Sequence, residues 1–175
     1  MMAEHDSSSS GGVGPELLGR LLDRHAAPLE LYARQWCQCP EDVVQQAFIE
    51  LAAQFPPPDD AVSWLYRVVR NKAISALRSS RRRKRHESAA VGGRSMAFVP
   101  SPGDRVDADL AAAALESLPI EQREVVVARI WGGLSFQQIG QLAGVSDSSA
   151  HRRYEAGLLA LRRKLRVACP NQKTR

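Results

Sequence analysis

Residues 64–85 read WLYRVVRNKAISALRSSRRRKR and contain nine Lys or Arg residues but no Asp or Glu. Apolar residues recur at the i, i+3, i+4 spacing of one helix face, namely Leu65, Val68, Val69, Ala73, Ala76 and Leu77. Arg67, Asn71 and Arg78 share another face, with Trp64 and Arg70 near it. The stretch predicts a helix that packs on a core and presents a cationic, aromatic-edged face to a nucleic acid. Its charge alone also fits a solvated helix end that leads into a linker.

The composition of the whole chain is that of a globular protein. Its 175 residues are 44% hydrophobic and 25% charged, which allows one medium or two small domains. The net charge is +5, and it is unevenly spread. Residues 135–175 carry eight Lys or Arg against two acids, whereas residues 91–134 carry four against six. Two basic regions flanking a mildly acidic middle predict two separate contacts with nucleic acid.

The sequence argues against several other classes of protein. No apolar run approaches the roughly 18 residues of a membrane span, and the N-terminus lacks the apolar core of a secretory signal. We therefore expect no membrane insertion and a cytoplasmic location. The chain has an odd number of cysteines, Cys37, Cys39 and Cys169, which indicates that their thiols are reduced. Cys37 and Cys39 form a C-x-C pair without a matching partner pair, so we expect no metal and no cofactor. Whether these two thiols sense redox state stays open.

Helical periodicity dominates the N-terminal part of the chain. An amphipathic stretch runs from Leu17 to Tyr32, with a break predicted near Pro28. A second helix is predicted to begin at Pro40 and to end before the proline-rich residues 55–58. Asp59 or Asp60 can then cap the basic helix that follows.

The periodic pattern stops after residue 85 and resumes near residue 109. Residues 88–106 are rich in Gly, Ser, Pro and Ala, which is typical of a flexible linker. A further helix starts at Pro119 and stops at Gly132 and Gly133. The predicted fold is all-α, with two small helical domains at 12–87 and 107–168. Residues 1–11 form a disordered N-terminus, and residues 169–175 form a tail.

Residues 134–164 have the pattern of a helix-turn-helix. Ser135 is a predicted N-cap, and Gln138 three residues later completes a capping box. Gly144 stands where a tight turn needs positive φ, and Ser146 caps the second helix. The first turns of that helix expose Ser, His and Arg side chains that can contact base edges in a major groove. An antiparallel helical hairpin with a polar surface remains an alternative for this segment alone.

Three stretches taken in order carry a resemblance to a known family. They are EDVVQQAF at 41–48, WLYRVVRN at 64–71, and the helix-turn-helix preceded by Leu118-Pro119 and Arg123. Together they resemble the sigma-70 family of RNA polymerase sigma factors, in its extracytoplasmic-function (ECF) group. The resemblance implies that residues 12–87 are sigma region 2 and that residues 107–168 are sigma region 4.

The resemblance also implies partners and site residues. It implies a non-enzymatic subunit that binds the β′ clamp and β flap of bacterial core RNA polymerase and directs it to promoter DNA. The implied polymerase contacts are Asp42, Val43, Gln45, Gln46 and Phe48. The implied contacts to the −10 element are Trp64, Arg67, Arg70, Asn71, Lys72 and Arg78. The implied contacts to the −35 element are Ser146, Ser148, Ser149, His151, Arg152 and Arg153.

The sequence departs from the family pattern at three positions. Glu155 and Ala156 stand where a His-Arg pair is usual, which removes two phosphate-facing groups and adds an acid. We therefore expect a different −35 affinity or sequence preference. Gln46 stands where a Glu is common, which removes one charge from the polymerase contact.

Two other functional classes are alternatives to this interpretation. A helix-turn-helix regulator that never joins core polymerase would need a ligand pocket or a symmetric interface in residues 12–87. A nucleic-acid enzyme would need clustered metal ligands, but the four histidines are scattered and no C-x-x-C or H-E-x-x-H motif occurs. The promoter sequence, the inducing signal and the presence of an anti-sigma factor are not encoded in these patterns.

Overall fold

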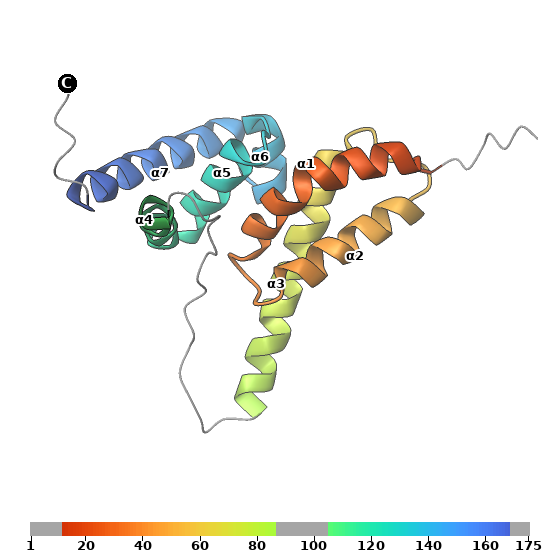
Figure 1. The fold of residues 1–175 in the computed structure, drawn as a ribbon, viewed down its shortest axis with the longest axis horizontal. Coiled ribbons are helices and arrows are strands. Elements are labelled where there is room, and N and C mark those ends of the chain that lie inside the picture. Colours follow the sequence, from red (N-terminus) through yellow and green to blue (C-terminus); the bar gives the residue numbers. More distant parts are fainter. Residues whose placement is uncertain (1–11, 87–104, 169–175) are drawn as a thin grey trace, which may run out of the picture.

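The computed structural model describes residues 12–86 and 105–168, and it contains seven helices and no strand in those ranges (Figure 1). The all-α prediction is confirmed. The N-terminal unit comprises α1 (Pro15–Ala33), α2 (Pro40–Ala53) and α3 (Ala61–His86). The C-terminal unit comprises α4 (Arg105–Glu116), α5 (Ile120–Ile130), α6 (Phe136–Ala143) and α7 (Asp147–Ala168). The predicted N-terminus, tail and most of the linker lie outside the described residues, and α4 begins just inside the predicted linker range.

Helix α1 continues through Pro28, so the predicted break is wrong. Proline removes one backbone hydrogen bond and usually kinks a helix. Here the turn that follows Pro28 buries Leu29, Tyr32 and Ala33 completely. Burying large side chains of this kind contributes about 1.5–3 kcal/mol each, which offsets the lost hydrogen bond.

Helix α3 begins and packs largely as its sequence predicts. The Ser63 backbone N–H donates to Asp60 Oδ1 at 3.0 Å, which confirms Asp60 as a capping residue. Leu65, Val69 and Ala73 of the predicted apolar stripe are fully buried. Tyr66 is also fully buried, although the stripe did not include it. The apolar face is therefore wider than the predicted stripe at the start of the helix, where helices from both units pack against it.

The helix-turn-helix forms from α6 and α7 with the predicted caps. Ser135 N–H donates to Gln138 Oε1 at 2.6 Å, and Gln138 N–H donates to Ser135 Oγ at 3.2 Å, which confirms the capping box. Gly144 has φ 69°, as the turn requires. Ser149 N–H donates to Ser146 Oγ at 3.2 Å, which confirms Ser146 as a cap of α7.

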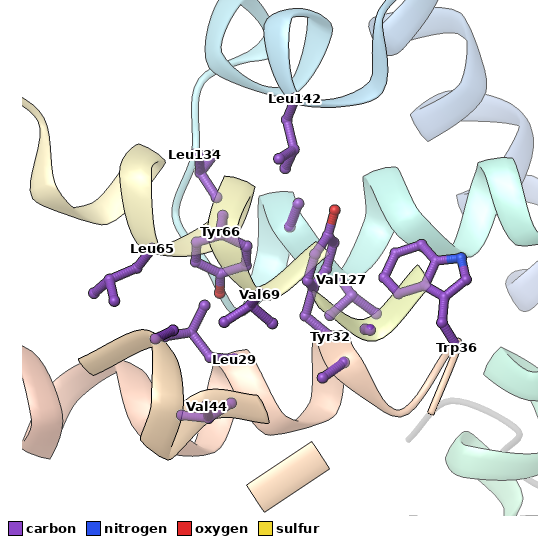
Figure 2. Packing of buried hydrophobic residues seen from close by; sticks show 14 of the residues in the cluster. Leu29, Tyr32, Trp36, Val44, Leu65, Tyr66, Val69, Val127, Leu134 and Leu142 are labelled. Carbon is purple, nitrogen blue, oxygen red and sulfur yellow. The ribbon is translucent and has the colours of Figure 1, made fainter. Parts of the chain in front are cut away.

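The two units share one continuous hydrophobic core. Helix α1 packs against α5, and α3 packs against α6. Figure 2 shows Tyr32 and Tyr66 of the N-terminal unit beside Val127 and Leu134 of the C-terminal unit. Gly132 makes this approach possible, because a Cβ atom there would lie only 2.7 Å from the Tyr66 hydroxyl oxygen. The sequence predicts two units on a tether and contains no local signal of this contact.

Candidate nucleic-acid and protein-binding surfaces

The basic face of α3 is exposed along most of its length. Arg67, Asn71 and Arg78 are exposed, and Trp64 is half-buried with its ring against the core. The Lys72 ammonium lies 2.7 Å from Glu50 Oε1 of α2, and this hydrogen bond lowers the pKa of Glu50. The predicted −10 residues thus form one cationic surface, with Lys72 shared between that surface and α2.

Arg70 differs from the other predicted −10 residues because it turns into the interface between the two units. Its Nε atom donates to Glu124 Oε1 of α5 at 2.6 Å. The Tyr32 hydroxyl donates to the same carboxylate oxygen at 2.7 Å. The Glu124 side chain is only 6% exposed, against 26% for Arg70. Glu124 of the C-terminal unit therefore pairs with Arg70, a cation that is predicted to contact promoter DNA.

The buried acid Glu124 was missed by the sequence analysis. Its signal is the position of an acid directly before three valines, at the start of a run that is buried from residue 124 to residue 128. A charge at the start of such a run must find a buried partner, because an unpaired charge is costly to remove from water. Burial, followed by the charge of Glu124, raises the pKa of the Tyr32 hydroxyl well above its ordinary value.

The predicted polymerase-binding residues of α2 fall into two groups. Asp42, Gln45 and Gln46 are exposed, and Val43 is half-buried. Phe48 is 6% exposed and belongs to the hydrophobic core.

Two large apolar residues near α2 are exposed but were not predicted as site residues. Ile49 is 53% exposed and Phe55 is 73% exposed. Ile49 follows Phe48 directly and therefore falls outside the i, i+3, i+4 stripe of the helix. Phe55 lies in the proline-rich loop, where periodicity gives no signal.

A shallow hollow between α2 and α3 brings the two predicted surfaces together. It is lined by the predicted polymerase-binding residues Asp42, Val43 and Gln46 and by the predicted −10 residues Asn71 and Lys72, with Ser75 beside them. Residues that the sequence analysis assigned to different partners therefore line one concavity.

The first turns of α7 present a hydrogen-bonded polar surface. Ser148, His151 and Arg152 are exposed, whereas Ser149 and Arg153 are half-buried. Arg152 Nη2 donates to Ser149 Oγ at 3.1 Å, and the Ser146 hydroxyl donates to the same oxygen at 2.9 Å. Because Ser146 is also the helix cap, its hydroxyl has little freedom to turn toward a base.

Contacts with Phe136 and Glu155 orient the His151 ring on the same surface. The ring packs edge-on against Phe136 with centroids 4.8 Å apart, and Nδ1 lies 3.6 Å from Glu155 Oε2. Gln137 and Gln141 of α6 are exposed and line a hollow with Ser146 and Asp147, so they extend the predicted −35 surface. The sequence analysis treated α6 only as a scaffold and missed these two amides.

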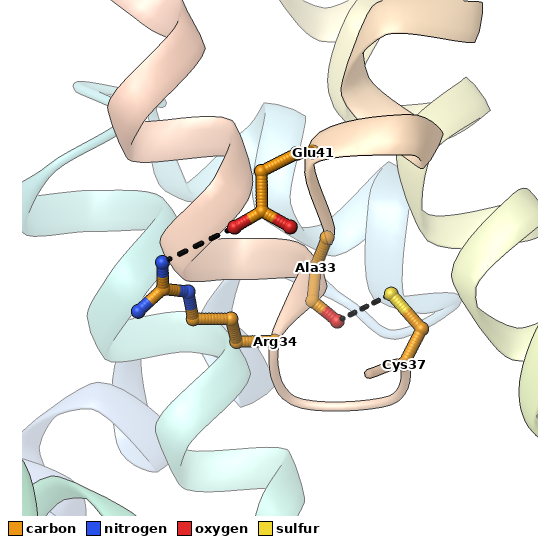
Figure 3. A network of polar contacts seen from close by, with 4 residues as sticks. All are labelled: Ala33, Arg34, Cys37 and Glu41. Atoms are coloured by element: carbon orange, nitrogen blue, oxygen red, sulfur yellow. Dashed lines mark hydrogen bonds and ion pairs between the residues drawn. The ribbon is translucent and has the colours of Figure 1, made fainter. Parts of the chain in front are cut away.

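The cysteines of the described residues differ in environment. Cys37 is buried and its thiol donates to the Ala33 carbonyl oxygen at 3.4 Å, beside an Arg34–Glu41 ion pair of the same length (Figure 3). Burial raises the pKa of Cys37 to about 11. Cys39 is exposed, and Cys169 lies outside the described residues. Within 12–86 and 105–168, no group of three or more His, Cys, Asp or Glu side chains is placed to hold a metal ion.

In the same ranges, no helix combines the length and apolar character that a membrane span needs.

Two helical units, a basic helix face and a helix-turn-helix are together the features of a DNA-binding protein. Residues 21–83 match the family model described as Sigma-70 region 2, and residues 108–161 match the model described as Sigma-70, region 4. The chain therefore belongs to the sigma-70 family of RNA polymerase sigma factors, as its sequence motifs predicted.

Two relatives place the chain near the ECF group. It is 32% identical over 169 residues to the ECF RNA polymerase sigma factor SigL of Mycobacterium tuberculosis, which covers 87% of this chain and 92% of SigL. It is 32% identical over 134 residues to the probable RNA polymerase sigma factor RfaY of Xanthomonas campestris pv. campestris. That match covers 71% of this chain but only 34% of RfaY, so the chain spans about a third of that relative.

The arrangement of the helices also resembles that of a solved sigma factor. The structure of RpoE from Bartonella quintana, in complex with the anti-sigma factor NepR, matches with a TM-score of 0.68. The match covers 88% of this chain and 99% of RpoE at 22% identity. At that identity the likeness concerns the fold.

Proposed function

We propose that this chain binds bacterial core RNA polymerase and directs transcription initiation at promoters with −10 and −35 elements. The main support is that two exposed basic surfaces, on α3 and α7, belong to two different units. Separated surfaces of modest affinity bind separated DNA elements tightly when one chain carries both. In this function the chain is a non-enzymatic specificity subunit and works in the cytoplasm, where polymerase and DNA meet.

The proposed division of labour follows the exposed residues. Asp42, Gln45 and Gln46 contact the β′ clamp, with Val43 at the edge and Phe48 holding the helix in place. The α3 residues Trp64, Arg67, Asn71, Lys72 and Arg78 capture the opened −10 element. The α7 residues Ser148, Ser149, His151, Arg152 and Arg153 contact the −35 duplex. The proposed domain boundaries remain 12–87 for region 2 and 107–168 for region 4.

Arg70 joins the −10 surface only when it leaves Glu124. The arrangement in Figure 1, with the two units packed together, is therefore proposed to be a closed state that does not yet present its complete −10 surface. Binding of polymerase and promoter would favour an open state in which Arg70 faces DNA.

The decisive experiment is gel filtration of the purified chain with sigma-free bacterial core RNA polymerase. Stoichiometric co-elution is expected, whereas separate elution at micromolar concentration with intact DNA binding would favour a stand-alone regulator. The double variant Asp42→Ala/Gln45→Ala should lose co-elution but retain DNA binding.

Arg67→Ala provides the complementary test of the DNA surface. It should retain co-elution but lower the slope of log affinity against log salt by about 0.7–0.9, the contribution of one phosphate contact. Arg24→Ala is the matched control, because Arg24 is an exposed cation of α1 that lies outside both surfaces. If the salt dependence of DNA affinity falls equally in both variants, Arg67 makes no specific phosphate contact.

A further inference from the structure

A cavity of about 520 Å³ lies where α1 meets α4 and α5. Leu31 of α1 lines one side, and Leu115, Val127 and Trp131 of the C-terminal unit line the others. This volume falls within the range of about 300–1,000 Å³ that is usual for small-molecule sites. None of the surfaces proposed for polymerase or promoter binding includes these residues. The cavity therefore needs an explanation of its own.

The walls of the cavity are apolar, and part of them is left uncovered. Val127 is fully buried and Leu115 is 8% exposed, so they form a fixed floor. Trp131 also lines the cavity but is 45% exposed, which is high for so large an apolar side chain. Covering an indole and its apolar neighbours is favourable at roughly 25 cal/mol per Å² of area removed from water. A ligand with an apolar body gains most from this surface.

Two polar side chains in the wall have buried atoms without a partner. Both the nitrogen and the oxygen of the Gln35 side-chain amide are buried and make no hydrogen bond within the described residues. The same holds for Arg123 Nε, although its Nη2 makes a long 3.4 Å bond to the Leu118 carbonyl oxygen. Buried polar atoms are normally paired, because an unpaired one costs about 1–3 kcal/mol. Each of these atoms has less than 1 Å² of accessible surface, so they lie behind the wall of the cavity and a ligand inside it does not touch them.

One cation in the wall of the cavity, Arg123, makes no ion pair within the described residues. Arg34 and Arg123 line it together with one acid, Glu116. Arg34 already pairs with Glu41 at 3.4 Å, as Figure 3 shows, which leaves Arg123 as the cation best placed to receive a ligand. Burial lowers the pKa of Arg123, against a smaller opposing effect of the Glu116 carboxylate, so its guanidinium is partly removed from water. A ligand carboxylate could pair with this guanidinium.

From these features we infer that the cavity binds a small amphipathic acid, with its apolar body against Trp131 and its carboxylate on Arg123. A compact molecule of one or two rings, or a short acyl chain, fits within a cavity of this size.

A bound acid would touch both units at once, and this has a consequence for regulation. Because α1 supplies one wall and α4 and α5 supply the others, the cavity exists only while the units are packed together. A ligand that binds only the closed state stabilises that state by mass action. The regulatory part of this inference rests on the proposed function, since it assumes that promoter binding requires opening. Ligand binding itself does not depend on that assumption.

The test is isothermal titration of the full chain with 1-naphthaleneacetate and, separately, with its neutral amide. We expect the acid to bind at least tenfold more tightly than the amide in the wild-type chain, because only the acid pairs with Arg123. Arg123→Gln should abolish this preference, and Ala112→Phe should abolish binding of both compounds by filling the cavity. Arg24→Gln, which removes an exposed cation of α1 outside the cavity, should bind as the wild type does.

Three results would overturn the inference. They are a dissociation constant for the acid weaker than about 1 mM, equal affinity for acid and amide, or unchanged binding in Ala112→Phe. If Arg123→Gln fails to fold, the acid–amide comparison and Ala112→Phe still decide the question. None of these titrations contains polymerase or DNA, so their failure is separate from a failure of the proposed sigma activity.

Discussion

Glu124→Gln is the substitution that tests most directly how the two units are held together. It keeps the size of the side chain but removes the charge that Arg70 contacts. The Glu124 carboxylate accepts from Arg70 Nε at 2.6 Å and from the Tyr32 hydroxyl at 2.7 Å, and both donors come from the N-terminal unit. The change therefore acts on an interface and leaves the packing inside each unit intact.

The expected magnitude follows from the kind of hydrogen bond that is weakened. A hydrogen bond to a charged group contributes about 1.5–3 kcal/mol, whereas a neutral one contributes about 0.5–1.5 kcal/mol. Glutamine can still accept from Tyr32, so we expect a loss of about 1–2 kcal/mol. Breaking a fully buried ion pair costs about 3–5 kcal/mol, but Arg70 is 26% exposed and can regain water. The ratio of closed to open molecules should therefore fall by a factor of about 5–30.

Small-angle X-ray scattering of the isolated chain measures this shift. The radius of gyration of Glu124→Gln should rise, and its promoter affinity should increase because Arg70 becomes available. Glu121→Gln is the matched control, since it removes an exposed acid from the first turn of the same helix. A folded Glu124→Gln chain with the scattering curve of Glu121→Gln would refute the role of the buried pair.

Three further predictions follow from the described contacts. Ser135→Ala should lower the free energy of unfolding by about 1 kcal/mol, measured by urea denaturation, because the capping box is lost; no change would show that the cap is redundant. Cys39 should react with iodoacetamide much faster than Cys37 at pH 8, measured by mass spectrometry, because burial raises the pKa of Cys37 to about 11; equal rates would contradict the buried thiol. The pKa of Tyr32 is raised in the folded chain, so its contribution to stability should be present below about pH 10 and be lost as pH rises toward its folded value. In the Tyr32→Phe variant, the free energy of unfolding, measured by denaturation at several pH values, should fall less steeply above about pH 10. If the pH dependence is unchanged, other groups cause the loss of stability.

Local signals in the sequence predicted the helices and their caps well. Ser135, Gln138 and Gly144 each act through neighbours within a few residues, so their roles can be inferred without knowing the fold. Pro28 misled the prediction because its local penalty is outweighed by burial of Leu29 and Tyr32, which depends on the tertiary packing.

The contact between the units lay beyond local reasoning. Arg70 and Glu124 are separated by 54 positions in the sequence, and no periodicity links residues so far apart. The motif also gives little information on exposure. Phe48 belongs both to the implied polymerase contact and to the apolar period of α2, and it is buried, whereas its neighbour Ile49 is exposed. A motif identifies a surface helix more reliably than it identifies which of its residues face outward.

The pairing of Arg70 with Glu124 makes the chain sensitive to ionic strength in a particular direction. Exposed cations such as Arg67 and Arg78 lose their attraction for phosphate as salt is added, since mobile ions screen them. The Arg70–Glu124 pair is screened much less, because its carboxylate is almost completely removed from solvent. Added salt therefore weakens the attraction between Arg70 and DNA phosphates more than it weakens the Arg70–Glu124 pair between the units. At high salt the chain should therefore stay in the closed state, and at low salt DNA should shift it more readily to the open state.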